Sequence, residues 1–226
     1  MHSFEAQFIT AAIPAGHVSL PGRLHVPAEA RGLVLFAHGS GSSRHSPRNQ
    51  RVAEFLHDLS LATLLFDLLS ESEEPADTFN ARLRNDIDLL ARRLTAATTW
   101  ARRQSELSEL PIGYFGASHG AAAAMVAATD SSTQIQALVL RGGRPDLAAP
   151  SLGRLRMPTL LIIGGNDETV AAINLEAWAR LRCEKAIETI PGASHLFEEP
   201  GALENVAALA ARWFDQHLDG AGPHAR

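Results

Sequence analysis

Six short apolar runs recur along the chain, and longer stretches with the residue spacing of amphipathic helices lie between most of them. This alternation is typical of βαβ units, in which buried parallel strands are covered by helices on both faces. The sequence therefore predicts an α/β fold with a mostly parallel, twisted sheet. The expected central strands are 32–37, 62–66, 112–115, 137–140, 159–163 and 186–190.

The N-terminal segments 4–11 and 17–26 are predicted to form an antiparallel start to this sheet. Prolines and glycines at 14–16 and 21–22 are expected to interrupt them. Apolar residues at helical spacing predict helices that pack on the sheet at 52–59, 83–101 and 203–217. Acidic residues interleave with the arginines of the second of these helices, which are therefore interpreted as a solvated face.

Length and composition narrow the classes of protein to which the chain can belong. Its 226 residues are expected to form one domain over 1–219, with a mobile tail over 220–226. A net charge of −5 argues against nucleic acid as a partner. A single cysteine, Cys183, favours a reducing, cytoplasmic location and provides no thiolate metal site. No run of 18 apolar residues occurs, so no membrane partner is expected.

A serine flanked by glycines, in Gly116-Ala117-Ser118-His119-Gly120, directly follows the apolar run 112–115 and directly precedes an alanine-rich, helix-forming stretch. Such a strand, sharp turn and helix would hold the serine in a strained conformation, which requires very small residues two positions away on either side. Ser118 is therefore the predicted nucleophile. His119 is the weaker candidate for the base, because its side chain would point away from Ser118.

A nucleophilic serine needs a base, and the base needs a third group to hold it. His195 is the predicted base because it lies in a loop after a predicted strand, whereas His217 falls in the last helix and His224 in the tail. The predicted acid is Asp167, directly after strand 159–163, at the edge where ligands of parallel sheets bind. Glu168 and Asp146 are the alternative acids, and Asp167 could instead cap a helix.

Backbone amides near the serine could stabilise the negative charge of an oxyanion. One predicted donor is the N–H of His119, the residue after the nucleophile. The second is the N–H of Ser40, in the glycine-rich segment that follows the first parallel strand. His38, at the start of this segment, is expected to brace the loop rather than to take part in the chemistry.

The order serine, aspartate, histidine resembles that of the α/β-hydrolase superfamily, most closely its dienelactone-hydrolase-like branch. The segments that carry this resemblance are 36–44, 64–69, 141–146 and 192–197. They are similar to a subgroup of bacterial hydrolases sometimes fused to phosphoribosyltransferase domains, although we identify no such segment in this sequence. Dienelactone hydrolases themselves use a cysteine nucleophile, where this chain has Ser118.

The resemblance implies cleavage of carboxylic esters through an acyl-enzyme, with no metal or organic cofactor. Only residues 142–157 separate two successive expected strands, so no lid domain is expected and the substrates should be small esters. Acyl transfer, peptide cleavage with the same triad, and a noncatalytic binding module are the alternatives. The sequence carries no indication of the oligomeric state.

Four arginines follow strands at the predicted site edge and could select anionic esters: Arg44, Arg48, Arg141 and Arg144. The competing interpretation is that Arg144 pairs with Asp146 and that Arg48 covers the first turn of its helix in solvent.

Overall fold

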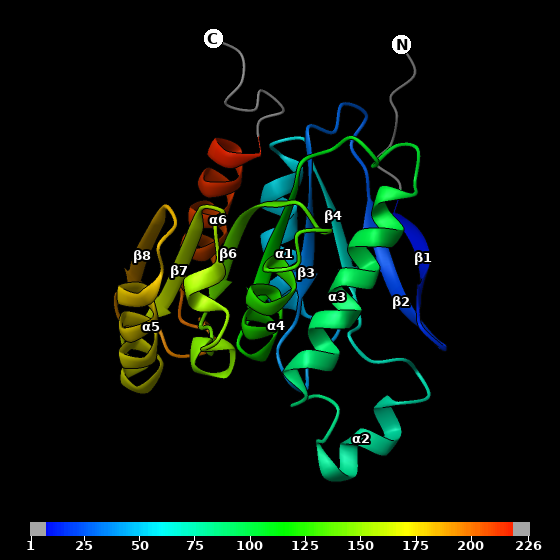
Figure 1. Cartoon of the computed structure of the whole chain (residues 1–226). Coiled ribbons are helices and arrows are strands. Elements are labelled where there is room, and N and C mark those ends of the chain that lie inside the picture. Colours follow the sequence, from blue (N-terminus) through cyan, green and yellow to red (C-terminus); the bar gives the residue numbers. More distant parts are fainter. Residues whose placement is uncertain (1–7, 219–226) are drawn as a thin grey trace.

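The computed structural model describes residues 8–218, which form one eight-stranded sheet covered by helices (Figure 1). The strand order is β1-β2-β4-β3-β5-β6-β7-β8. The pairs β1–β2 and β2–β4 are antiparallel, and all the others are parallel. The strands are β1 (Phe8–Ala15), β2 (Val18–His25), β3 (Gly32–Ala37), β4 (Leu61–Phe66), β5 (Ile112–Ala117), β6 (Ile135–Arg141), β7 (Thr159–Gly164) and β8 (Lys185–Ile190). The expected α/β architecture is confirmed.

Helices cover both faces of this sheet. They are α1 (Pro47–His57), α2 (Glu74–Asn80), α3 (Ile87–Arg102), α4 (His119–Ala128), α5 (Glu168–Arg180) and α6 (Ala202–His217), with two short 3₁₀ helices, η1 (Pro145–Ala148) and η2 (Leu152–Arg154). One buried cluster packs α1 and α6 against the sheet, and a second cluster packs α3 and α4 against the opposite face. No helix within residues 8–218 is long and apolar enough to cross a membrane. The predicted tail over 220–226 lies outside the described residues.

All six predicted central strands are present, and each observed end lies within two residues of the predicted one. The predicted N-terminal interruptions were wrong, because Pro14 lies inside β1 and Pro21 inside β2. Pro14 is tolerated because β1 is an edge strand. The Pro21 carbonyl accepts a hydrogen bond from the Asp67 N–H at 3.0 Å, and ladder pairing between β2 and β4 starts only at the next residue.

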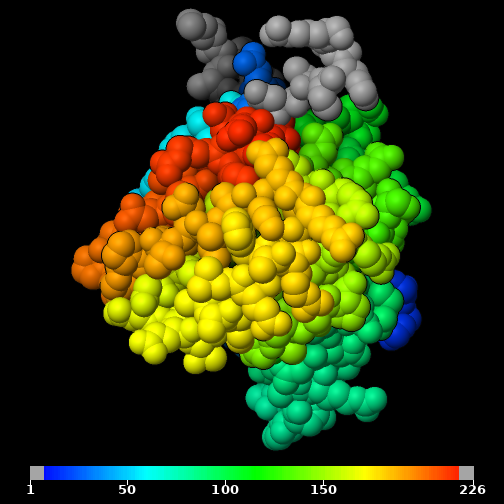
Figure 2. Space-filling model, turned by 60° about the vertical axis from the view of Figure 1, so that its left-hand side comes forward, coloured from blue at the N-terminus to red at the C-terminus, as the bar shows by residue number. Residues whose placement is uncertain are grey.

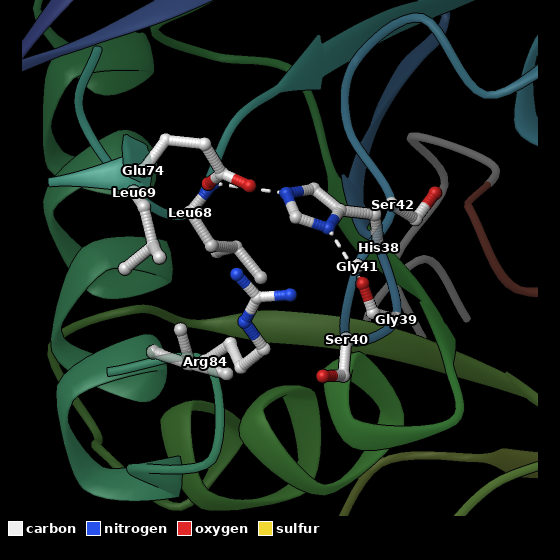
Figure 3. Close-up of a pocket in the computed structure, with 10 residues that line it drawn as sticks. His38, Gly39, Ser40, Gly41, Ser42, Leu68, Leu69, Glu74 and Arg84 are labelled. Carbon is white, nitrogen blue, oxygen red and sulfur yellow. Dashed lines mark hydrogen bonds between the residues drawn. The ribbon is translucent and has the colours of Figure 1, made fainter. Parts of the chain in front are cut away.

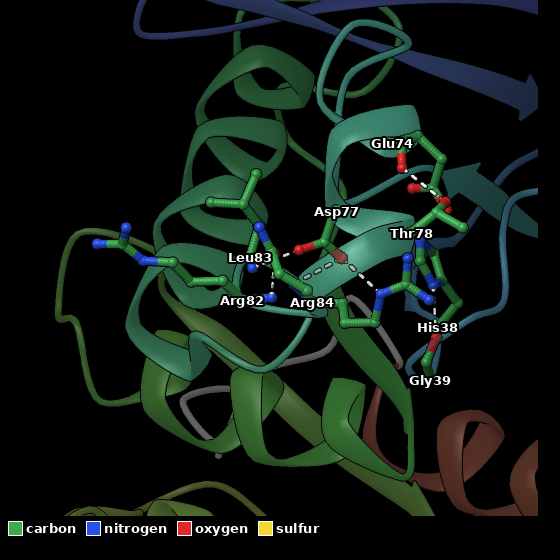
Figure 4. Close-up of polar contacts among 9 residues, drawn as sticks. His38, Gly39, Glu74, Asp77, Thr78, Arg82, Leu83 and Arg84 are labelled. Carbon is green, nitrogen blue, oxygen red and sulfur yellow. Dashed lines mark hydrogen bonds and ion pairs between the residues drawn. The ribbon is translucent and has the colours of Figure 1, made fainter.

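The long helix expected from residue 83 begins at Ile87 instead, and the short helix α2, absent from the sequence prediction, precedes it. The Asp86 side chain caps α3 by accepting a hydrogen bond from the Leu89 N–H at 2.9 Å. The buried Asp77 carboxylate of α2 accepts hydrogen bonds from the Leu83 N–H and from Arg84 (Figure 4). These contacts hold residues 83 and 84 in a loop.

The interpretation of the α3 arginines as a solvated face was wrong for Arg93. This side chain is buried, donates to Glu73 at 2.7 Å and donates to the Ala15 carbonyl at 2.9 Å. Because Ala15 ends β1, Arg93 links α3 to the edge of the sheet.

Two histidines stack where β2 and α1 end. The ring centroids of His25 and His57 lie 3.7 Å apart, and His57 Nε2 lies 2.8 Å from Thr63 Oγ1. Burial, and repulsion from His25 when that ring is protonated, lower the pKa of His57 to about 4, and burial also lowers the pKa of His25. Both rings are therefore neutral in the folded protein at pH 7.

We expect this pair to destabilise the protein in mild acid. The folded-state pKa values lie below the ordinary value of 6.5, so the unfolded chain binds protons first as the pH falls. Stability is therefore complete above pH 6.5 and falls toward pH 4, by about 1–2 kcal/mol at pH 5. Urea unfolding at pH 7 and pH 5 measures this loss. His57→Gln should flatten the pH dependence, whereas His17→Gln, in the exposed β1–β2 turn, should retain it.

Candidate active site

Ser118 lies between β5 and α4 with φ 50° and ψ −117°, a backbone conformation that L-residues rarely adopt. Its flanking glycines make this turn possible. A Cβ atom at Gly120 would lie 2.1 Å from the Ala37 carbonyl oxygen, and one at Gly116 would lie 2.6 Å from Ala121 Cα. The turn is therefore strained, is packed against the end of β3 and has the backbone form expected of a nucleophile elbow.

The predicted acid and base lie in contact. His195 Nδ1 and Asp167 Oδ2 are 2.7 Å apart, so the ring N–H on Nδ1 donates to the carboxylate and Nε2 remains able to accept a proton. The other carboxylate oxygen, Oδ1, accepts a hydrogen bond from the Val170 N–H at 3.3 Å and caps α5. The sequence offered helix capping as the alternative to a role beside the histidine, and the Asp167 carboxylate makes both contacts.

The residues considered as alternatives for the acid and the base lie elsewhere or bind other groups. Glu168 is the first residue of α5, and Asp167 rather than Glu168 bonds to His195. Asp146 accepts two hydrogen bonds from the Arg144 guanidinium, at 2.9 and 2.7 Å. His217 is in the last helix and lies 3.4 Å from Glu184.

The backbone at the end of β6 joins the serine to the histidine. The Ser118 N–H donates to the Arg141 carbonyl at 3.2 Å. The next residue, Gly142, has φ +52°, and a Cβ atom there would lie 3.4 Å from both Cε1 and Nδ1 of His195. The imidazole therefore packs over the same backbone that holds the elbow, which brings the three predicted residues to one edge of the sheet.

His38 braces the loop after β3, as expected (Figure 3). Its Nδ1 donates to the Gly39 carbonyl at 2.9 Å, and its Nε2 accepts from the Leu68 N–H at 3.0 Å. Burial lowers the pKa of His38, so the ring is neutral and its two bonds fix one tautomer. The imidazole thus ties the loop to the segment that follows β4.

Both predicted oxyanion amides face no acceptor in the described part of the chain. The Ser42 N–H donates to the Gly39 carbonyl at 3.1 Å, which closes a turn around Ser40 and Gly41. Within residues 8–218, neither the Ser40 N–H nor the His119 N–H donates a hydrogen bond. Within these residues, both predicted donors are thus without a competing acceptor.

The arginines of the site edge have different surroundings. Arg44 pairs with Asp67, Arg48 donates to Glu198 at 2.8 Å, and Arg144 pairs with Asp146 as the competing interpretation expected. Arg48 is therefore not simply in solvent. Arg141 is buried and forms no ion pair with a described residue.

Solved structures share this fold. A dienelactone hydrolase from Anabaena variabilis is 52% identical, with a TM-score of 0.92, and the match covers 94% of this chain and 99% of that chain. Est1E from Butyrivibrio proteoclasticus shares the fold, with a TM-score of 0.78 at 16% identity over 92% of this chain and 98% of its own.

A protein of Mycobacterium tuberculosis that carries the name of a phosphoribosyl transferase is 53% identical over 93% of this chain. This chain spans about half of that relative, 47% of its length. The family model described as "Alpha/beta hydrolase domain" matches residues 30–208. The chain therefore belongs to the alpha/beta hydrolase domain family, with dienelactone-hydrolase-like character.

Proposed function

We propose that the protein is a serine hydrolase that cleaves small carboxylic esters through an acyl-enzyme intermediate. The observation that carries the proposal is the 2.7 Å contact between His195 and Asp167 at the sheet edge that also bears the strained Ser118. A histidine oriented by a carboxylate beside an elbow serine is the arrangement that activates a hydroxyl for attack on a carbonyl.

The reaction follows from the donors and acceptors of these groups. His195 Nε2 accepts the Ser118 hydroxyl proton while Oγ attacks the ester carbonyl carbon. The tetrahedral intermediate collapses, the carbon–oxygen bond to the alcohol breaks, and the imidazolium gives its proton to the departing alcohol. Water then attacks the acyl-serine, with His195 again accepting a proton, and the acid is released.

Two amides would hold the negative charge of each tetrahedral intermediate. The unbonded N–H groups of Ser40 and His119 are the donors that we assign to this role, because they flank the elbow and face no acceptor within residues 8–218. His38 supports the first of them by fixing the loop after β3.

The absence of an inserted domain between β6 and β7 supports small substrates. Between β6 and β7 the chain forms only η1 and η2, so no inserted domain covers the elbow from this side. A cavity of about 330 Å³ lies next to the loop after β3. Neither Ser118 nor His195 lines this cavity, whose lining residues are Ser42, Ser43, Arg44, Asp67, Leu69, Ser70, Glu71, Glu74 and Pro75.

Covalent labelling tests this proposal. A fluorophosphonate probe should modify Ser118, because the strained elbow serine and the His195–Asp167 pair lie at the same edge of the sheet. Peptide mass spectrometry should find the adduct on the peptide that contains Ser118, and Ser118→Ala should abolish it. An adduct on another serine, or labelling that persists in Ser118→Ala, would contradict the assignment of the nucleophile.

A further inference from the structure

Arg84, in the segment between α2 and α3, has a guanidinium group that is bonded on one side only. The buried Asp77 carboxylate accepts hydrogen bonds from Arg84 Nε and from the backbone N–H groups of Leu83 and Arg84 (Figure 4). The outer nitrogen Nη2 is closed to solvent and has no hydrogen-bond partner among the described residues. One nitrogen of the guanidinium is therefore anchored to α2, while another makes no bond.

Stability alone does not account for an arginine at this position. A buried donor without a partner loses its hydrogen bonds to water and gains none in return. A neutral pair, such as methionine at position 84 with asparagine at position 77, would fill the same space without a buried charge on either side. The role of the arginine therefore depends on what lies beside the unbonded part of its guanidinium.

The guanidinium lies against the loop after β3, which carries one of the predicted oxyanion amides. A Cβ atom at Gly41 would lie 3.8 Å from Arg84 Nη1. Arg84 and residues 38–42 also line one small cavity (Figure 3). Its volume is about 10 Å³, which is room for about one water molecule. The turn over residues 39–42 therefore has little space in which to move toward Arg84.

The same turn contacts the nucleophile. A Cβ atom at Gly39 would lie 3.3 Å from Ser118 Cβ. The Ser42 N–H closes the turn by donating to the Gly39 carbonyl at 3.1 Å, and His38 fixes the start of the turn through the same carbonyl. The turn thus has Ser118 at one end and the Arg84 guanidinium at the other.

The segment that supplies Arg84 protrudes from the body of the molecule, as the teal projection at the bottom of Figure 2 shows. Phe79, on α2, is 92% exposed. The side chain of Asp77 is buried and that of Arg84 is only 20% exposed, so this pair points inward from an exposed segment. In Figure 4 the Arg84 side chain extends toward His38, whereas that of Arg82 extends in the opposite direction.

We propose that Arg84 is a positioning residue, which holds the turn over residues 39–42, and with it the Ser40 amide, in place for the oxyanion. The guanidinium supports the turn at Gly41, and the Asp77 carboxylate fixes the guanidinium. A donor of this kind is effective only when it is held at the position where the negative charge develops. The inference rests on the proposed ester hydrolysis and adds a positioning residue to it.

Removing both charges of the Asp77–Arg84 pair separates positioning from stability. Arg84→Met alone leaves a buried carboxylate without its partner, so it should unfold at a lower urea concentration than the wild type. The double variant Asp77→Asn/Arg84→Met leaves no buried charge and should recover most of this loss. Its kcat on p-nitrophenyl acetate should still fall about tenfold or more, with KM changed by less than about twofold, because a displaced donor weakens only the transition state.

Arg82→Gln is the matched control. Arg82 is an exposed arginine of the same segment, two residues before Arg84. This variant should retain the kcat and the urea midpoint of the wild type.

Amide hydrogen exchange provides a second readout that does not depend on turnover. The Ser42 N–H reports whether the turn is closed, because it is bonded to the Gly39 carbonyl. The peptide over residues 38–44 should exchange faster in the double variant than in the wild type or in Arg82→Gln. If the wild type hydrolyses no ester, the proposed function fails, and faster exchange would still show that Arg84 holds the turn.

Two results would overturn the inference. One is a folded double variant with the kcat of the wild type, which would make the pair purely structural. The other is unchanged exchange over residues 38–44 in that variant, which would mean that the turn does not rest on Arg84. If the double variant does not fold, Arg84→Lys decides the question. Lysine keeps a positive partner for Asp77 but lacks the planar fork that reaches the turn, so the protein should stay folded and still lose kcat.

Discussion

Ser118→Ala and His195→Ala should each lose about a thousandfold or more in kcat/KM on p-nitrophenyl acetate. The first change removes the attacking oxygen, and the second removes the base that accepts its proton. Asp167→Asn should lose activity less completely, because the amide still lies beside His195 but presents an N–H where the ring needs an acceptor. Asparagine is also an effective helix cap, so this variant should leave the start of α5 intact.

Stability measurements separate chemistry from folding in these variants. All three should unfold at urea concentrations close to that of the wild type. Glu168→Gln is the matched control, because Glu168 adjoins Asp167 but does not bond to His195. Near-complete activity in Asp167→Asn combined with collapse in Glu168→Gln would show that the acid is misassigned.

Gly120→Ala should destabilise the protein by about 3 kcal/mol or more, or prevent its folding. The new methyl carbon would lie 2.1 Å from the Ala37 carbonyl oxygen and 2.4 Å from that of His38. Both obstacles are backbone atoms at the end of a central strand, so no side-chain rotation can relieve the clash. Urea unfolding measures the loss, and soluble expression reports it if folding fails.

Gly153→Ala is the matched control for this change. A Cβ atom at Gly153 would meet nothing within 4 Å, so its effect on the free energy of unfolding should stay within about 0.5 kcal/mol. Equal stability of the two variants would mean that the elbow does not pack against β3 as closely as the structure has it.

Local patterns were sufficient to predict the central sheet, and they also singled out the three residues that we propose as the triad. A buried parallel strand appears as an apolar run, and the elbow carries its glycines within two residues of Ser118. The histidine and the acid could be selected because each follows a strand, and strand ends converge at one edge of a parallel sheet. The contact between His195 and Asp167, 28 residues apart, follows from that topology.

Contacts between distant charged residues could not be read from the sequence in this way. The Arg48 side chain donates a hydrogen bond to Glu198, 150 residues away in the sequence. The Arg93 side chain donates to Glu73 and to the carbonyl of the last residue of β1. Such pairs leave no periodic pattern in the sequence, so the Arg93 side chain was predicted to lie on a solvated face of the helix. The start of α3 was missed for a similar reason, because Asp77 of α2 binds the backbone of Leu83 six residues later.

In the proposed mechanism, the two contacts of Asp167 couple catalysis to the local unfolding of one helix. One carboxylate oxygen holds the imidazole while the other holds the first turn of α5, so the orientation of His195 depends on whether that turn is formed. Helix ends fray at a much lower free-energy cost than that of global unfolding. Fraying of α5 would therefore release the histidine while the sheet is still intact, and activity would vanish before the fold does during gradual denaturation.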